Sequence, residues 1–231
     1  EMLVILPFEK DFYKKHQVNA HFVGHPLLDA ISDLAPIDAE NFKKEYGLND
    51  KEIIALLPGS REQEVEKMLS LMLSVRDYFK NYQFVIAGAP SLPKEFYQKF
   101  VDYDVHFVSN KTYDLLRCSK AALVTSGTAT LETALLNVPE IVCYRTSTIS
   151  YEIGKRVVKN IKFISLVNLI MDREIVKELI QKELNTENLV NELQKILEGQ
   201  KRDKMLENYE LLREKLGGKG ASEHAAEIIV N

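Results

Sequence analysis

The sequence of 231 residues has only two cysteines, no excess of basic over acidic residues and no long apolar run. Each of these absences argues against a class of protein. Cys118 and Cys143 lie in apolar surroundings without a CxxC pair, so we expect buried thiols in a reducing compartment instead of a disulfide framework or metal cage. The net charge of −4 argues against a nucleic-acid binder. No apolar run approaches the roughly 20 residues of a membrane-spanning helix.

Several catalytic signatures are also missing. None of the five histidines pairs with another at i, i+4 on an expected helix, which argues against a zinc site. There is no GxSxG elbow and no GK[ST] phosphate loop, so hydrolase and Walker-type chemistry have no support. The composition, with 45% apolar and 28% charged residues, is instead that of an ordinary globular protein.

Short apolar runs alternate with amphipathic stretches through the middle of the chain. This alternation predicts a Rossmann-like α/β fold, with right-handed crossovers and a doubly wound parallel sheet. The expected strands are 53–57, 84–87, 105–108, 121–124 and 141–144, with helices at 60–79, 94–101, 113–118 and 128–136. Ser60 and Gln63 form a capping-box pattern at the start of the first helix.

The remaining chain is predicted to be mostly helical. We expect a last short strand at 164–167 and helices at 173–184, 187–197 and 202–216. Thr186 is the expected N-cap of the second helix, and Ser222 that of a final short helix. Three parts follow: a hinge remnant of another domain at 1–35, a nucleotide-binding domain at 36–200, and C-terminal helices at 201–231. Because residue 1 falls inside an apparent strand, we interpret the chain as truncated.

Two loops at the carboxyl edge of the predicted sheet carry the strongest functional signal, because ligands of this fold bind there. Residues 57–61 place a glycine, Ser60 and Arg61 at a helix N-terminus, which favours an anion; a plain capped turn is the alternative. Residues 125–132 combine small and hydroxyl side chains with Glu132. This carboxylate fits the two hydroxyls of a ribose, or serves only as a first-turn partner of the helix dipole.

Two further segments leave their alternatives open. Asn168, with Arg173 and Glu174, is either part of the same cleft or a loop amide bonded to its own backbone. The cationic segment 155–162 suits an anionic membrane surface, whereas a solvated helix face is the simpler interpretation.

Five ordered motifs resemble the lipid-A-disaccharide synthase family along the whole chain: FVGHPL (22–27), LLPGSR (56–61), SGTATLE (126–132), SLVNL (165–169) and GGKGAS (217–222). The resemblance implies a two-domain, inverting glycosyltransferase of the GT-B type that needs no metal or cofactor. Such an enzyme transfers 2,3-diacylglucosamine from its UDP donor to 2,3-diacylglucosamine 1-phosphate, releasing UDP and lipid A disaccharide phosphate. This chain would be the donor half, inactive alone, because the general base is expected in the missing N-terminal half.

The resemblance also assigns residues and partners. Glu132 would bind the ribose, and Ser60 and Arg61 would face the diphosphate together with the loop Ser126, Gly127, Thr128, Ala129 and Thr130. Asn168, Arg173 and Glu174 match polar positions of the donor cleft. The implied partners are the lipid acceptor, the missing N-terminal domain, a second copy of the chain and the cytoplasmic face of a bacterial inner membrane, without nucleic acid. The alternatives are a UDP-GlcNAc 2-epimerase, a peptidoglycan-type GlcNAc transferase and a non-catalytic nucleotide-binding module.

Overall fold

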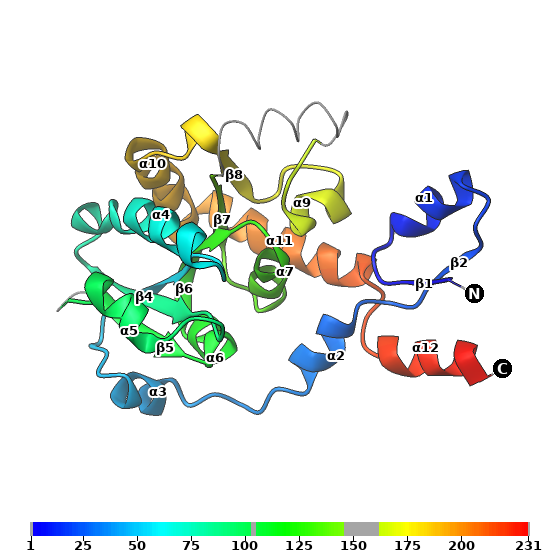
Figure 1. Cartoon of the computed structure of the whole chain (residues 1–231), viewed down its shortest axis with the longest axis horizontal. Helices are drawn as coiled ribbons and strands as arrows, with labels where there is room; N and C mark the ends of the chain where they lie inside the picture. The colour runs from blue at the N-terminus through cyan, green and yellow to red at the C-terminus, as the bar shows by residue number, and fades with distance from the viewer. Residues whose placement is uncertain (1, 103–104, 146–161, 231) are drawn as a thin grey trace.

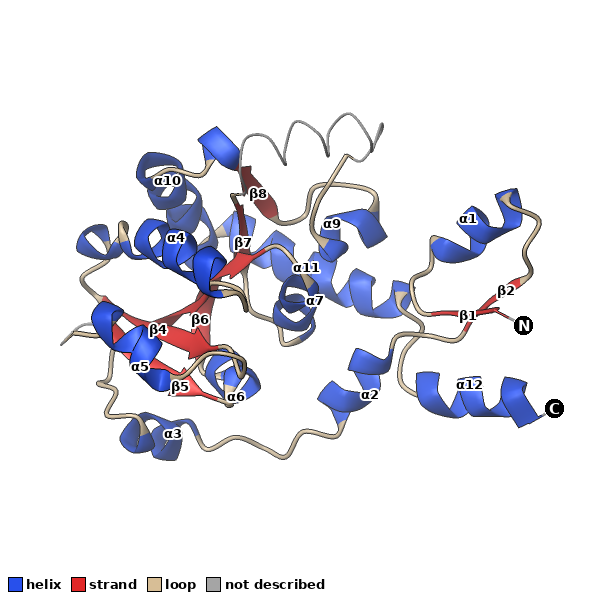
Figure 2. Ribbon diagram, viewed as in Figure 1, coloured by secondary structure: helices blue, strands red, loops and turns tan. Residues whose placement is uncertain are grey.

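A parallel sheet of six strands forms the centre of the described structure, a computed structural model that describes residues 2–102, 105–145 and 162–230 (Figures 1 and 2). The strand order is β5-β4-β3-β6-β7-β8, and every neighbouring pair is parallel. The predicted doubly wound α/β fold is therefore confirmed. The bounds are β3 Glu52–Leu57, β4 Tyr82–Gly88, β5 Val105–Ser109, β6 Ser119–Thr125, β7 Glu140–Tyr144 and β8 Lys177–Ile180.

Helices cover both faces of this sheet, and β3 shows how the sequence produces that arrangement. Ile54 and Leu56 belong to one buried cluster, whereas Ile53, Ala55 and Leu57 belong to the other. Successive side chains of a strand point to opposite faces, so an uninterrupted apolar run fits a strand that is covered on both sides.

The first face packs against α4 Glu62–Leu73, α7 Thr128–Leu135, α10 Thr186–Leu197 and α11 Gln200–Lys215. The second packs against α3 Ala39–Glu45 and α6 Thr112–Arg117. Shorter helical elements are η1 Arg76–Tyr78, α5 Lys94–Tyr97 and η2 Gln98–Phe100.

The prediction for residues 164–184 is wrong in its order of elements. The expected strand is α9 Leu166–Met171, whose N-cap Ser165 accepts a hydrogen bond from the backbone N–H of Asn168. Within the expected helix, Lys177–Ile180 forms β8, followed by η3 Gln181–Glu183. The open edge of β7 supplies backbone partners for β8, and this tertiary pairing outweighs the local helical spacing of the apolar residues.

Three predicted caps are also wrong. Helix α4 begins at Glu62 with Arg61 at its N-cap and no side-chain cap, so Ser60 and Gln63 form no capping box. Asn185, not Thr186, caps α10; Thr186 instead bonds its hydroxyl to that of Ser74 at 2.7 Å. Ser222 lies inside α12 Ala221–Val230. Its backbone N–H donates a hydrogen bond to the carboxylate of Asp29, which belongs to a different helix.

The N-terminal segment forms a small unit beside the sheet domain, at the right of Figure 1. Strands β1 Met2–Val4 and β2 Ala20–Phe22 pair in parallel and are joined by α1 Glu9–Lys15. Helix α2 Pro26–Ser32 follows, and α12 packs beside it.

Helix α11 packs into the core, although the sequence assigns it to a separate tail. Its Met205, Tyr209 and Leu212 are buried in the same cluster as the helices of the first face. Among the described helices after α10, α12 lies outside that layer and packs beside α2. In the described ranges no helix is long and apolar enough to cross a membrane.

Candidate functional site

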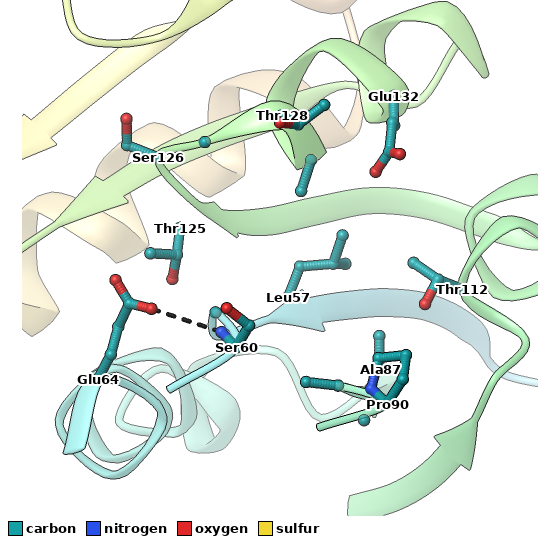
Figure 3. Close-up of a pocket in the computed structure, with 15 residues that line it drawn as sticks. Leu57, Ser60, Glu64, Ala87, Pro90, Thr112, Thr125, Ser126, Thr128 and Glu132 are labelled. Atoms are coloured by element: carbon teal, nitrogen blue, oxygen red, sulfur yellow. Dashed lines mark hydrogen bonds between the residues drawn. The ribbon is translucent and has the colours of Figure 1, made fainter. Parts of the chain in front are cut away.

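A cavity of about 360 Å³ opens at the carboxyl edge of the sheet, where β3 adjoins β6 (Figure 3). From β3 the chain crosses outward to β4 in one direction, whereas β6 leads to β7 in the other, so the loops diverge and leave a crevice. The described lining residues are Leu57, Gly59, Ser60, Glu64, Ala87, Gly88, Ala89, Pro90, Thr112, Thr125, Ser126, Gly127, Thr128, Ala129 and Glu132. Six of the residues predicted from the sequence are among them: Ser60, Ser126, Gly127, Thr128, Ala129 and Glu132.

The loop after β6 brings a helix N-terminus to this cavity. Gly127 is the N-cap of α7 and has no side chain to cap it. The first N–H groups of a helix lack partners within the helix, and Gly127, Thr128 and Ala129 all line the cavity. Ser126 donates its hydroxyl to the carbonyl of Ile164 at 3.0 Å, which ties this loop to the segment before α9.

The loop after β3 approaches the cavity from the opposite wall. Gly59 has a φ of +106°, and a Cβ there would lie 2.4 Å from Glu64 Oε2. The same oxygen accepts the backbone N–H of Ser60 at 3.4 Å (Figure 3). The Ser60 carbonyl accepts the Ser91 hydroxyl at 2.8 Å. The positive φ therefore favours a glycine at position 59, and a Cβ there would require the Glu64 side chain to move.

The sequence places Thr125 in the loop 125–132 without giving it a role of its own, and the structure makes it part of the cavity lining. It is the last residue of β6 and is 5% exposed. Its hydroxyl has no hydrogen-bond partner among the described residues. A buried hydroxyl without a partner is costly, and a ligand in the cavity would supply one. Its place directly after an apolar run was the available signal.

Glu132 lies on α7 with its carboxylate directed into the cavity (Figure 3). Tyr113 of α6 donates its hydroxyl to Glu132 Oε1 at 2.8 Å. Burial, followed by this hydrogen bond and the charge of Glu132, raises the pKa of Tyr113 well above its usual range. Glu132 therefore has a specific partner that the sequence did not reveal.

Two predicted residues lie beside the cavity without being among its described lining residues. Thr130 is fully buried, and its hydroxyl donates to the Gly127 carbonyl at 2.8 Å, so it stabilises the loop from behind. Arg61 is exposed at the N-cap of α4, next to Ser60. The charged groups among the described lining residues are the carboxylates of Glu64 and Glu132.

The predicted group around Asn168 lies outside the described cavity lining. The buried Asn168 amide donates to the Val176 carbonyl at 2.9 Å, and its oxygen accepts the N–H groups of Ile175 and Val176. Of the two interpretations, the contacts match a side chain bonded to nearby backbone. Arg173 donates to Asn208 and Glu174 pairs with Lys177. That these residues bind a donor stays a prediction.

Glu178 is the centre of this buried network. Its carboxylate accepts the backbone N–H groups of Ile164 and Ser165, the Ser165 hydroxyl and the Asn168 amide at 2.7–3.0 Å. Because Ile164 also accepts the Ser126 hydroxyl, the network supports the loop that forms the cavity wall.

In the part of the chain that the structure describes, no group of three or more His, Cys, Asp or Glu side chains is placed to hold a metal ion. The cationic segment 155–162 lies outside the described residues except for Lys162, which is exposed and 3.4 Å from Asp172.

Comparison with known sequences gives a match over nearly the whole chain. A family model described as lipid-A-disaccharide synthetase matches residues 1–230. A lipid-A-disaccharide synthase from Syntrophus aciditrophicus is 40% identical, over 97% of this chain and 61% of that protein. Another, from Myxococcus xanthus, is 35% identical over 99% of this chain and 61% of that protein. The chain thus spans about three-fifths of the length of these curated relatives.

Solved structures with the same fold are far less similar in sequence. A UDP-GlcNAc 2-epimerase from Neisseria meningitidis bound to UDP-GlcNAc superposes with a TM-score of 0.68 at 15% identity, over 99% of this chain and 60% of that chain. A glycosyltransferase involved in lipopolysaccharide biosynthesis superposes with a TM-score of 0.57 at 17% identity, over 98% of this chain and 62% of that chain. At such identities the likeness establishes the fold alone.

Proposed function

Because the chain belongs to the lipid-A-disaccharide synthetase family, we propose that it is the donor-binding part of a glycosyltransferase of lipid A biosynthesis. The whole enzyme transfers 2,3-diacylglucosamine from a UDP donor to 2,3-diacylglucosamine 1-phosphate, giving lipid A disaccharide phosphate and UDP. The observation that carries the proposal is the cavity at the carboxyl edge of the sheet, where a helix N-terminus and a carboxylate lie on one wall.

In this proposal the cavity binds the nucleotide of the donor. The first turn of α7, from Gly127 to Ala129, receives the diphosphate, because free N–H groups and the helix dipole favour an anion. Thr125 offers its buried hydroxyl to the same group. Glu132 accepts the ribose hydroxyls. Arg61 extends from the N-cap of α4 towards the outer phosphate, where a guanidinium forms forked hydrogen bonds.

The chemistry of the step follows from these groups. As the glycosidic bond to the donor phosphate breaks, negative charge accumulates on the departing UDP. Preorganised N–H donors and a guanidinium stabilise that charge, and removal of one such donor typically costs about 10²–10³ in rate. We therefore propose transfer without a metal or cofactor, with inversion at the anomeric carbon. The general base that activates the acceptor hydroxyl belongs to the part of the enzyme outside this chain.

The rest of the protein and its surroundings complete the proposal. The curated relatives extend beyond the matched region, and we assign acceptor binding to that remainder. Residues 1–35 and α12 are proposed to pack against it. The enzyme is proposed to work at the cytoplasmic face of a bacterial inner membrane, where both lipid substrates reside, and a homodimer is a further expectation.

Calorimetric titration of this chain with UDP tests the nucleotide site. We expect UDP to bind, and Arg61→Ala to weaken binding about tenfold to 100-fold, the value of hydrogen bonds to charged groups. Lys67→Ala removes the same charge from an exposed position of α4 and should leave the affinity unchanged. A folded chain that does not bind UDP would refute the nucleotide site.

A turnover assay tests the division of labour. The chain alone should transfer no diacylglucosamine, whereas the enzyme that includes the acceptor part should. Transfer by this chain alone would refute the placement of the general base. An epimerase or a peptidoglycan-type transferase receives support only from the shared fold, and the full enzyme separates them by its preference for acylated over non-acylated UDP-glucosamine.

A further inference from the structure

The hydrogen-bond partner of the Glu132 carboxylate is Tyr113, which is not among the described residues that line the cavity. Tyr113 donates its hydroxyl to Glu132 Oε1 at 2.8 Å. Tyr113 belongs to α6 and Glu132 to α7, which precede and follow β6 in the chain. Thr112, the residue before Tyr113, is among the described lining residues, whereas Tyr113 is not. The contact is therefore a link between two helices that ends on a cavity residue.

The hydroxyl of Tyr113 is a permanent donor in this contact. Partial burial of the phenol raises its pKa, and the hydrogen bond and charge of Glu132 raise it further. The phenol therefore stays protonated at neutral pH, and its single proton is directed at Oε1. A carboxylate has about four positions that accept hydrogen bonds. Tyr113 takes one of them, and the others remain for a ligand in the cavity.

We propose that Tyr113 is a positioning residue, which holds the Glu132 carboxylate in the orientation that accepts the ribose hydroxyls of the donor. This inference rests on the proposed function. An unrestrained glutamate samples several rotamers, and binding must then order it. The hydrogen bond from Tyr113 orders the side chain before the ligand arrives. Tyr113 itself touches no substrate.

A purely structural link between α6 and α7 makes a different prediction. If the contact only stabilised the fold, its loss would weaken all ligands of the cavity alike. If Tyr113 acts through Glu132, its loss weakens only ligands that present ribose hydroxyls. The ratio of the affinities for UDP and 2′,3′-dideoxy-UDP therefore separates the two roles.

Calorimetric titration of the chain and its variants with these two nucleotides tests the inference. The unmodified chain should prefer UDP. Tyr113→Phe should reduce this preference about threefold to tenfold and should change the affinity for dideoxy-UDP little. The expected loss is less than the full contribution of a hydrogen bond to a charged group, because Glu132 can still bind the ribose without its partner. Tyr82→Phe removes a hydroxyl from another partly buried tyrosine, the first residue of β4 and thus at the end of the strand away from the cavity, and should change neither affinity.

A double-mutant cycle completes the test. Glu132→Ala should abolish the preference, and adding Tyr113→Phe to it should have no further effect, because the two residues act as one unit. Thermal melts establish that each variant is folded. An equal loss of affinity for both nucleotides in Tyr113→Phe would overturn the inference, as would an undiminished effect in the Glu132→Ala background. Absence of UDP binding by the unmodified chain would overturn the proposed function, and the inference with it.

Discussion

Glu64 lies directly against Gly59, so closely that a Cβ at position 59 would be 2.4 Å from Glu64 Oε2. The same carboxylate oxygen accepts the N–H of Ser60 at 3.4 Å, inside the cavity. A carboxylate thus takes up the Ser60 N–H at the edge of the cavity that we propose for the diphosphate. Glu64 is therefore an acidic side chain within the proposed diphosphate site.

Removing the charge of Glu64 should therefore strengthen diphosphate binding. Glu64→Gln keeps the size of the side chain and an oxygen for the Ser60 N–H, but it removes the repulsion between two anions. We expect the affinity for UDP to rise about threefold to tenfold at low salt and less at high salt, where exposed charges are screened. Calorimetric titration with UDP and with uridine, which has no phosphate, measures the effect.

The uridine arm is the control for this prediction, since its affinity should not change. If Glu64→Gln weakens both ligands, Glu64 binds a hydroxyl of the nucleoside and does not compete with the phosphate. Glu207→Gln removes the same charge from an exposed position of α11 and controls for a general change in net charge.

Substituting Gly59 should disturb both the backbone and Glu64. Gly59 and Gly47 both have positive φ, but a Cβ at Gly47 meets nothing within 4 Å. Gly47→Ala should thus cost only the backbone strain, about 1–2 kcal/mol in the free energy of unfolding. Gly59→Ala should cost more and should also weaken UDP binding, because Glu64 must move. Chemical denaturation of the two variants compares them; equal losses would show that the contact with Glu64 has no energetic weight.

The expected strands were predictable because most of them are buried apolar runs with their own turn signals; β5, which contains His106 and is partly buried, is the exception. Ile53 to Leu57 alternates between two hydrophobic clusters, and no other local structure buries such a run as well. The segment 164–184 was not predictable in the same way. Its strand β8 exists because β7 offers an open edge, and that edge is formed by residues far away in the sequence.

The cavity shows the same division. Ser126, Gly127 and Thr128 were found because small and hydroxyl residues after a strand are a local pattern. Thr125 fell within the predicted loop 125–132 but received no role, because only the folded chain shows that its buried hydroxyl lacks a partner among the described residues. Tyr113 was missed, because its importance depends on Glu132, which belongs to another helix. Asn168 has a polar side chain in an apolar run, but only the folded chain reveals the backbone groups that it satisfies.

Asp29 should hold the C-terminal helix in place. Its carboxylate accepts the N–H groups of Gly220 at 2.6 Å and Ser222 at 3.1 Å, at the start of α12. These hydrogen bonds, together with that of the Ser222 hydroxyl, lower the pKa of Asp29. We expect Asp29→Ala to speed hydrogen exchange in α12 and to leave β3 unchanged.

The salt bridge between Asp33 and Lys219 lies beside this contact at 2.7 Å. Asp33→Ala is the matched control, because it removes an exposed ion pair but leaves both capped N–H groups satisfied. Exchange in α12 that is equally fast in the two variants would contradict a capping role for Asp29.

Glu140 should make the protein less stable as the pH rises. Its side chain is fully buried on β7, and neither carboxylate oxygen has a hydrogen-bond partner among the described residues. Burial, and then the charge of Glu178, raise its pKa well above the ordinary value of 4.5. The folded state therefore binds a proton that the unfolded state releases, so stability is full below pH 4.5 and falls as the pH rises towards the raised pKa. Each pKa unit of difference is worth about 1.4 kcal/mol.

Glu140→Gln should remove this dependence, because a neutral amide of the same size needs no proton. We expect the melting temperature of the variant to exceed that of the unmodified chain by several degrees at pH 7–8. Such a shift corresponds to about 1–2 kcal/mol in the free energy of unfolding. The difference should shrink as the pH falls towards 4.5. Thermal melts across this range measure it. Glu178→Gln is the contrasting variant: its carboxylate accepts four hydrogen bonds, so it should destabilise the fold at neutral pH. A gain in stability for Glu140→Gln that is the same at every pH would mean that Glu140 is not protonated in the folded protein.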